Sequence, residues 1–241
     1  MQNSEIIKIE NLTKRFHMGE GDFTALRNIS LTFGKGEFTG LVGPSGSGKT
    51  TLLNIIGSLD NPTEGKAIVL GNSVSALTHK QSAVLRNFHI GFIFQTYNLL
   101  SVYSVFDNVE FALLLQKHTV TKRHKMVMEA LDWVGLADKA QSKPAQLSGG
   151  ECQRVSIARA MVKRPEIVLA DEPSANLDAA NSHHIIQTMK KLNQELNTTF
   201  IFATHDEKVM QYLDRIIHVK DGMVEKDLII QDSKTESHVS I

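Results

Sequence analysis

One eight-residue segment constrains the fold of this chain more than any other. Residues 43–50 read Gly-Pro-Ser-Gly-Ser-Gly-Lys-Thr and fit the pattern G-x-x-x-x-G-K-[ST]. An apolar strand is predicted before this segment at residues 38–42, and a helix after it at residues 49–59. Glycines let such a loop curl until its backbone N–H groups face inward, and the helix directs the positive end of its dipole to the same place. The segment therefore predicts a phosphate-binding loop in an α/β fold.

The residue types in this phosphate loop (residues 43–50) indicate which phosphates it binds. Lys49 is expected to neutralise the β- and γ-phosphates of a nucleoside triphosphate, and Thr50 to hold Mg²⁺ through its hydroxyl. No Asn-Lys-x-Asp sequence, which would read guanine, is present. We therefore predict that the loop binds a nucleoside triphosphate together with Mg²⁺. The other expected phosphate-binding residues are Gly43, Pro44, Ser45, Gly46, Ser47, Gly48 and Thr51.

A second apolar strand, predicted at residues 167–170, ends in the carboxylates Asp171 and Glu172. Because the carboxyl ends of parallel strands meet at one sheet edge, these acids are expected beside the phosphate loop. Asp171 would then complete the Mg²⁺ shell, and Glu172 would act as general base or orient the attacking water. An acidic pair in this position often only caps a helix. Beside a phosphate loop, the pair favours ATP hydrolysis.

Composition and charge exclude several other classes of function. The 241 residues are 41% hydrophobic and carry 26 basic and 26 acidic side chains, so no net field attracts nucleic acid or anionic lipid. The only cysteine is Cys152, which excludes intrachain disulfides and fits a reducing compartment. Neither a secretory signal nor a run of ~20 apolar residues is visible. Any role at a membrane would therefore depend on a partner.

Strand and helix patterns alternate along the chain, which is typical of a largely parallel sheet covered by helices. Residues 5–12 and 28–33 alternate apolar and polar residues and predict a small N-terminal antiparallel sheet. Helical patterns dominate residues 96–163 and predict a helical lobe inserted into the core. Further strands are predicted at residues 90–94, 199–203 and 215–219, and helices at residues 105–115, 122–134, 155–162 and 183–196.

These patterns predict one domain over residues 1–241. Its α/β core, with the antiparallel sheet, is assigned to residues 1–95 and 164–226. The inserted lobe is assigned to residues 96–163, and residues 227–241 are expected to form a flexible tail because they carry few core-sized side chains.

The most specific motif is Leu-Ser-Gly-Gly-Glu-Cys-Gln-Arg at residues 147–154. It resembles the LSGGQ-type signature of ATP-binding cassette (ABC) proteins, with Glu151 as a familiar variant of glutamine. The Ser148 hydroxyl and the Gly149 and Gly150 amides, followed by a helix start, would form a second anion-binding surface. A helix cap with two flexible glycines explains the same residues locally.

Other elements of the ABC family follow in the expected order. Gln95 resembles the Q-loop glutamine that senses Mg²⁺, and His205 resembles the switch histidine that contacts the γ-phosphate. Asp178 closes a segment similar to the D-loop, and Phe16 lies where many members place an adenine-stacking tyrosine. A lone glutamine in a loop is usually solvated, and a lone histidine at a strand end is more often structural than catalytic. A plain core role for Phe16 also stays open. The resemblance implies a P-loop NTPase fold with a RecA-like parallel core, an N-terminal antiparallel β subdomain and an inserted helical subdomain.

The resemblance also implies partners. In the family, two subunits pair head to tail, so the phosphate loop of one faces the signature motif of the other with ATP between them. A transmembrane permease is expected to dock near residues 95–105, where Tyr97, Leu99, Leu100 and Tyr103 could form an apolar groove. The chain is then expected at the cytoplasmic face of the inner membrane, held there only by its partner.

Residues 57–60, 91–100 and 144–150 are most similar to the lipoprotein-release (LolD-like) and macrolide-export (MacB-like) subgroup. An FtsE-like regulatory ATPase that controls a cell-wall enzyme remains the alternative. A soluble ABC protein acting on nucleic acid or ribosomes is disfavoured, because the chain contains neither a second signature nor sustained heptads. A P-loop kinase or GTPase is disfavoured by the signature motif.

Overall fold

Strand β3 (Phe38–Val42), which leads into the phosphate loop, lies inside a six-stranded sheet with the order β10-β9-β3-β8-β7-β6. The computed structural model describes residues 4–19 and 21–230. All five residues of β3 are buried, as expected for a parallel strand covered on both faces. β3 pairs in parallel with β8 and β9, which come from the other end of the chain. The predicted parallel core is confirmed.

The remaining strands of this sheet are parallel except β10, which runs antiparallel to β9 at the edge. The prediction placed the start of the flexible tail too early, at residue 227. Residues 227–229 belong to β10, and the Arg215 guanidinium donates to the Asp227 carboxylate at 2.6 and 2.8 Å. Residues 231–241 of that tail lie outside the described residues. The strands are β6 (Ile90–Ile93), β7 (Ile167–Asp171), β8 (Thr199–Thr204), β9 (Arg215–Lys220) and β10 (Met223–Ile229).

A second sheet is antiparallel, with the order β2-β1-β4-β5. Its strands are β1 (Glu5–Met18), β2 (Gly21–Gly34), β4 (Glu64–Val69) and β5 (Asn72–Ser73). The predicted strands at residues 5–12 and 28–33 cover only one end of the β1–β2 hairpin. Asn11 and Asn28 have left-handed backbones beside shifts in the pairing register, and these irregularities interrupt the alternation used for the prediction.

Helix α1 (Lys49–Ile56) lies between the two sheets and packs against strands of both. Its buried side chains Leu52, Leu53, Ile55 and Ile56 belong to a core shared with the antiparallel sheet. Helix α2 (His79–His89) borders β6 and begins with a capping box between Thr78 and Gln81. The sequence patterns did not predict α2, whose only buried residue is Leu85.

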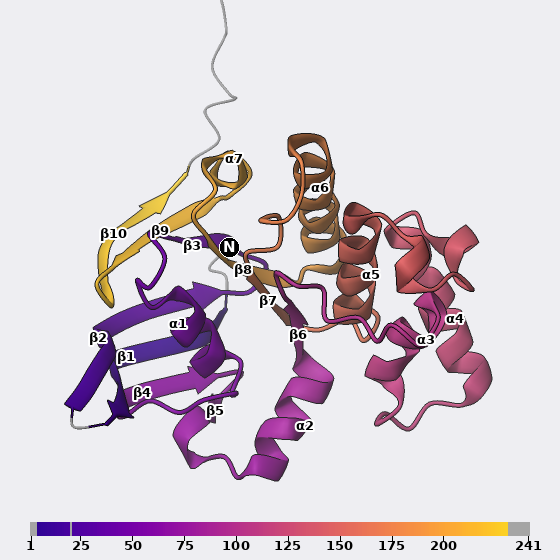
Figure 1. Cartoon of the computed structure of the whole chain (residues 1–241). Helices are drawn as coiled ribbons and strands as arrows, with labels where there is room; N and C mark the ends of the chain where they lie inside the picture. The colour runs from indigo at the N-terminus through magenta and orange to yellow at the C-terminus, as the bar shows by residue number, and fades with distance from the viewer. Residues whose placement is uncertain (1–3, 20, 231–241) are drawn as a thin grey trace, which may run out of the picture.

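The helical lobe is inserted between β6 and β7 and lies on the opposite side of the molecule from β10 (Figure 1). The predicted helix at residues 105–115 ends at Glu110 and continues as a 3-10 turn. The lobe contains α3 (Val105–Glu110), α4 (Val120–Trp133) and α5 (Gly149–Met161), with 3-10 turns at Phe111–Leu113, Ala137–Lys139 and Pro144–Gln146. Outside it lie α6 (Ala179–Leu196), α7 (Glu207–Met210) and the 3-10 turn Val74–Ala76.

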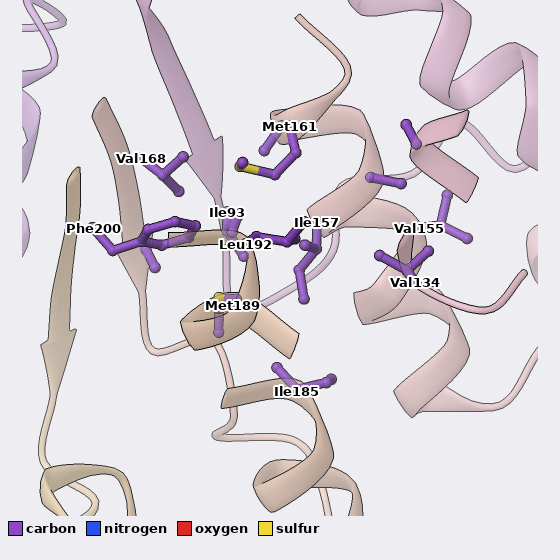
Figure 2. Close-up of a cluster of buried hydrophobic side chains, with 14 of the residues drawn as sticks. Ile93, Val134, Val155, Ile157, Met161, Val168, Ile185, Met189, Leu192 and Phe200 are labelled. Carbon is purple, nitrogen blue, oxygen red and sulfur yellow. The ribbon is translucent and has the colours of Figure 1, made fainter. Parts of the chain in front are cut away.

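A continuous apolar core joins the lobe to the parallel sheet (Figure 2). Helices α5 and α6 direct side chains such as Met161 and Met189 toward Val168 and Phe200 of the sheet. These four side chains are buried, so truncating any of them to alanine would cost about 2–5 kcal/mol. The signature helix α5 is thus fixed to the strand that carries the acidic pair. No helix in the described part of the chain is long and apolar enough to cross a membrane.

Candidate nucleotide-binding site

Five separate segments of the chain meet around a cavity of about 440 Å³ at the carboxyl edge of the parallel sheet. The predicted acidic pair, Gln95 and His205 all line this cavity together with the phosphate loop. The lining residues are Phe23, Ala25, Ser45, Gly46, Ser47, Gly48, Lys49, Thr50, Thr51, Gln95, Asp171, Glu172 and His205. The fold therefore brings together residues that are up to 182 positions apart, from Phe23 to His205.

Close packing against neighbouring backbone fixes the shape of the phosphate loop. A Cβ atom on Gly43 would lie 1.9 Å from the carbonyl oxygen of Val219, so only glycine fits there. Gly48 has a φ of +102°, which favours glycine, and a Cβ on it would lie 2.6 Å from the Ala25 oxygen. The N–H of Gly222 donates to the Ser47 carbonyl at 3.1 Å. Strand β9 and the turn after it therefore hold the loop in place.

The ammonium group of Lys49 lies on the phosphate loop itself. Its Nζ donates to the carbonyl oxygens of Gly43 at 2.7 Å and of Pro44 at 2.9 Å. Burial lowers the pKa of Lys49, and the nearby carboxylates Glu172 and Asp171 only partly oppose this. A bound anion would stabilise the charged form of this buried cation. The geometry thus supports the predicted phosphate role of Lys49.

Thr50 and Asp171 form a pair of oxygen ligands at the sheet edge. The Thr50 hydroxyl donates to the Asp171 carboxylate at 3.0–3.1 Å, although the two residues are far apart in sequence. The pKa of Asp171 is raised above its usual value, chiefly by burial and further by the neighbouring Glu172. The hydrogen bond from Thr50 and the charge of Lys49 oppose this rise only in part. A divalent cation would favour the ionised form, and Mg²⁺ prefers such oxygen donors.

The acidic side chain of Glu172 is held in one orientation. Its backbone is left-handed, with φ of +47°, and its N–H donates to the Ala203 oxygen at 2.9 Å. His205 Nδ1 lies 2.7 Å from Glu172 Oε1, and because a carboxylate can only accept, this nitrogen donates. Strained backbone held by surrounding structure is common at functional sites. Glu172 is thereby suited to orient a water molecule and accept its proton.

The residues of the cavity fit Mg-ATP. Loop amides, the Lys49 ammonium and the α1 N-terminus supply positive potential for a triphosphate, and Thr50 and Asp171 would hold the metal. The Ser47 hydroxyl is buried without a hydrogen-bond partner among the described residues, so this loop has an unused polar group. Magnesium, when bound, would offset negative charge on the phosphate oxygens.

The predicted residues of the signature motif and D-loop are not among the residues that line the cavity. Ser148 caps α5: its Oγ accepts from the Glu151 N–H at 3.3 Å, and its own N–H donates to the Glu151 carboxylate at 2.8 Å. Lys139, together with Ser148, lowers the pKa of Glu151 to about 2. Asp178 caps α6 by accepting from Asn181 at 2.9 and 2.7 Å. Ser148 and Gly149 remain exposed, so a second molecule could reach them.

Phe23 was missed by the sequence reasoning. Among the described residues, the aromatic ring that lines the cavity belongs to Phe23, not to the predicted Phe16. The two phenylalanines are partners across the β1–β2 hairpin, and the ammonium of Lys14 lies 4.8 Å from the centre of the Phe16 ring. A phenylalanine directly opposite Phe16 in a hairpin was the signal available, but the strands predicted at residues 5–12 and 28–33 did not include it.

The sequence profile of the ABC transporter family matches residues 26–175, which span the phosphate loop, the signature motif and the acidic pair. The chain belongs to the ABC transporter family. This ABC cassette is 42% identical over 226 residues to an uncharacterized ABC transporter ATP-binding protein of Methanocaldococcus jannaschii, covering 92% of this chain and 96% of that protein. A dimeric post-hydrolysis structure of that archaeal cassette, bound to ADP and phosphate, has a TM-score of 0.86 at 41% identity and covers 94% of this chain and 99% of the other.

Two further relatives of the cassette have transport-related names. The lipoprotein-releasing system ATP-binding protein LolD of Bacteroides thetaiotaomicron is 41% identical over 222 residues, which are 92% of this chain and all of that protein. The macrolide export ATP-binding/permease protein MacB of Rhodopirellula baltica is 41% identical over 225 residues, which are 92% of this chain and 33% of that longer protein. The expected family, the ABC ATPase fold, ATP hydrolysis and the Mg-ATP requirement are thereby confirmed.

Proposed function

We propose that this cassette is the ATPase subunit of a membrane export or lipoprotein-release system, and that two copies hydrolyse ATP at shared interfaces. The observation that carries the proposal is the division of its site. One chain supplies the cavity with Lys49, Asp171 and Glu172, whereas the exposed Ser148 and Gly149 lie outside that cavity. A triphosphate that needs donors on both faces would take the second set from another copy.

The relatives support both parts of this proposal. The archaeal cassette with 41% identity is a dimer with ADP and phosphate, which supports a head-to-tail pair. LolD and MacB are named for lipoprotein release and macrolide export, which supports a role with a permease. The regulatory FtsE-like alternative gains no support from these names. The membrane would be reached through the permease, at its cytoplasmic face.

Within each site, the residues of this chain divide the work. Lys49 and the loop amides would bind the phosphates, while Thr50, Asp171 and Gln95, which line the same cavity, would hold the metal. Glu172, oriented by His205, positions water and takes its proton. Ser148, Gly149, Gly150 and Glu151 of the partner copy, with Asp178 nearby, close the site over the triphosphate and separate the attacking water from bulk solvent. ATP thus joins the two subunits, and hydrolysis releases them.

Substituting Glu172 by glutamine tests this assignment. Glu172→Gln keeps the size of the side chain and removes the proton acceptor, so ATP binding should persist while turnover falls about 100-fold or more. Purified protein should then form a stable dimer in Mg-ATP, measured by light scattering during gel filtration. Lys49→Ala is the matched control and should lose nucleotide binding itself. Near-normal turnover in Glu172→Gln, or full turnover by a monomer, would reject the proposed site.

A further inference from the structure

Two consecutive residues just after Gln95 have left-handed backbones. Tyr97 and Asn98 have φ values of 55° and 50°. Residues with side chains seldom adopt this conformation, and they keep it only where surrounding structure holds them. Local hydrogen bonds come from Thr96, whose carbonyl accepts from the Asn98 N–H and whose hydroxyl lies 3.0 Å from Asn98 Oδ1. Neither of these two contacts involves the backbone carbonyls of Tyr97 and Asn98.

Arg159 of the signature helix α5 holds those carbonyls. Its guanidinium donates to the oxygen of Tyr97 at 2.6 Å and to that of Asn98 at 2.5 Å. Among the described residues, no carboxylate forms an ion pair with Arg159; its third contact is the Ser156 hydroxyl at 3.4 Å. Burial lowers the pKa of Arg159, as expected for a cation that lacks an acidic partner. The Tyr97 and Asn98 carbonyls are therefore its main polar partners.

The left-handed turn in turn places Tyr97 against the signature motif. A methyl group on Gly149 would lie 3.0 Å from the Tyr97 hydroxyl oxygen and 3.7 Å from Leu177, so the two loops are in close contact. The side chain of Asn176 donates to the Gln95 carbonyl at 3.0 Å. The turn after Gln95, the signature motif and the D-loop thus form one contact network within a single subunit.

We propose that Arg159 is a positioning residue: by holding residues 97–98 in the left-handed turn, it braces Tyr97 against Gly149 and so sets where the signature motif meets the second subunit. The inference rests on the proposed ATP-bound dimer. Arg159 is not among the residues that line the cavity, and its hydrogen bonds within the described residues go to Tyr97, Asn98 and Ser156. Its effect should therefore fall on closure of the dimer and leave nucleotide binding by one subunit intact.

The test uses the full-length chain carrying Glu172→Gln, in which ATP-driven dimers accumulate. Arg159→Met removes the two hydrogen bonds, and Asn98→Val places a β-branched residue that disfavours the left-handed turn. Each should raise the protein concentration for half-maximal dimerisation at saturating ATP about tenfold, because the left-handed turn is no longer held. Affinity for a fluorescent ATP analogue should change less than about twofold in either variant.

Two controls separate positioning from general stability. Asn98→Gly tolerates the left-handed turn without support, so it should dimerise normally and should restore most dimerisation to Arg159→Met. Arg123→Met removes another half-buried guanidinium that donates to a backbone carbonyl, and it should dimerise like the parent.

Parent-like dimerisation of Asn98→Val would overturn the inference, even if Arg159→Met failed to fold. The inference would also be overturned if Asn98→Gly gave no recovery in a folded Arg159→Met protein, because Arg159 would then act by packing alone. If the Glu172→Gln parent itself formed no dimer with ATP, the proposed function would fail and the inference with it.

Discussion

Two residues at this site are held in states that they would not adopt on their own, one in its backbone conformation and one in the burial of its charge. Glu172 is left-handed without being glycine, and Lys49 is a buried cation whose pKa is lowered. Each is held by its neighbours: the Ala203 carbonyl and His205 hold Glu172, and the carbonyls of the phosphate loop hold Lys49. Such residues are prepared for a ligand before it arrives, which lowers the reorganisation needed when charge develops during reaction.

The aromatic residue that lines the cavity, Phe23, should contribute to nucleotide affinity. Phe23→Ala is expected to weaken binding of a fluorescent ATP analogue about two- to tenfold, because an aromatic stack contributes about 0.5–1.5 kcal/mol. Phe16→Ala should weaken it less if Lys14 keeps the Phe16 ring engaged. Inorganic triphosphate, which has no base, should compete equally well in all three proteins. A larger loss in Phe16→Ala than in Phe23→Ala would restore the sequence prediction.

The signature helix is the element whose stability should depend most clearly on pH. Because Lys139 and Ser148 lower the pKa of Glu151 to about 2 from 4.5, its stabilising contribution is complete above pH 4.5 and is lost as the pH falls toward 2. Glu151→Gln should cost about 1 kcal/mol of unfolding free energy at pH 6, and the difference should be roughly halved at pH 3 and vanish only below pH 2.

Urea unfolding at pH 6 and pH 3 measures this difference. Glu195→Gln is the control, because Glu195 is exposed and lies 3.8 Å from Lys191 on α6. That pair should contribute little at either pH. A difference between wild type and Glu151→Gln that stays constant down to pH 3 would contradict the assigned pairing.

The strength of each element's own pattern decided whether the sequence could predict it. Strands such as β3 and β8 are buried on both faces and read as continuous apolar runs, so they were placed correctly. Helix α2 buries only Leu85, and β10 is almost wholly exposed, so neither carries a periodic apolar signal. These elements depend on their neighbours: α2 on the edge of β6, and β10 on pairing with β9 and on the Arg215–Asp227 ion pair.

The site was predictable to the extent that motifs report it. The phosphate loop, the acidic pair, Gln95 and His205 were found by order and residue type, and they meet in one cavity. Contacts between distant segments leave no such trace. Arg159 donates to carbonyls 61 and 62 positions away, and a carbonyl accepts in the same way whichever side chain it carries. For the same reason the support of the loop by Gly222 was not predicted.

At the scale of the whole molecule, exposed apolar side chains occur on the helical lobe, on α2 and on β10, and the lobe lies on the opposite side of the molecule from β10 (Figure 1). Leu115 is 82% exposed, and the neighbouring Gln116 donates to the Asn87 carbonyl at the end of α2. The Tyr97 hydroxyl packs against Gly149, while Leu100 and Tyr103 of the predicted groove are exposed. Other exposed apolar residues of the lobe include Val102, Phe111, Leu114 and Leu115, and α2 carries Val84 and Phe88. We propose this surface as the dock for a cytoplasmic helix of the permease.

Replacing Leu115 by serine tests the dock. The tagged cassette is purified from solubilised membranes, and the amount of multispanning membrane protein that co-purifies with it is measured. Leu115→Ser should reduce this amount about tenfold, while basal ATPase activity stays unchanged. Ile229→Ser is the matched control, because Ile229 is 75% exposed on β10 at the other side of the molecule. Recovery identified by mass spectrometry should be normal for this control. Equal recovery with both variants would place the dock elsewhere.

The position of β3 has a consequence for biosynthesis. This strand pairs with β8 and β9, and the loop after it receives a hydrogen bond from Gly222. Residues 1–50 are synthesised well before β8, β9 and Gly222, so the phosphate loop lacks these supports during most of translation. We expect competence to bind nucleotide to arrive late in synthesis, because a chain that ends shortly before β9 lacks both the β3–β9 pairing and the Gly222 hydrogen bond that support the phosphate loop.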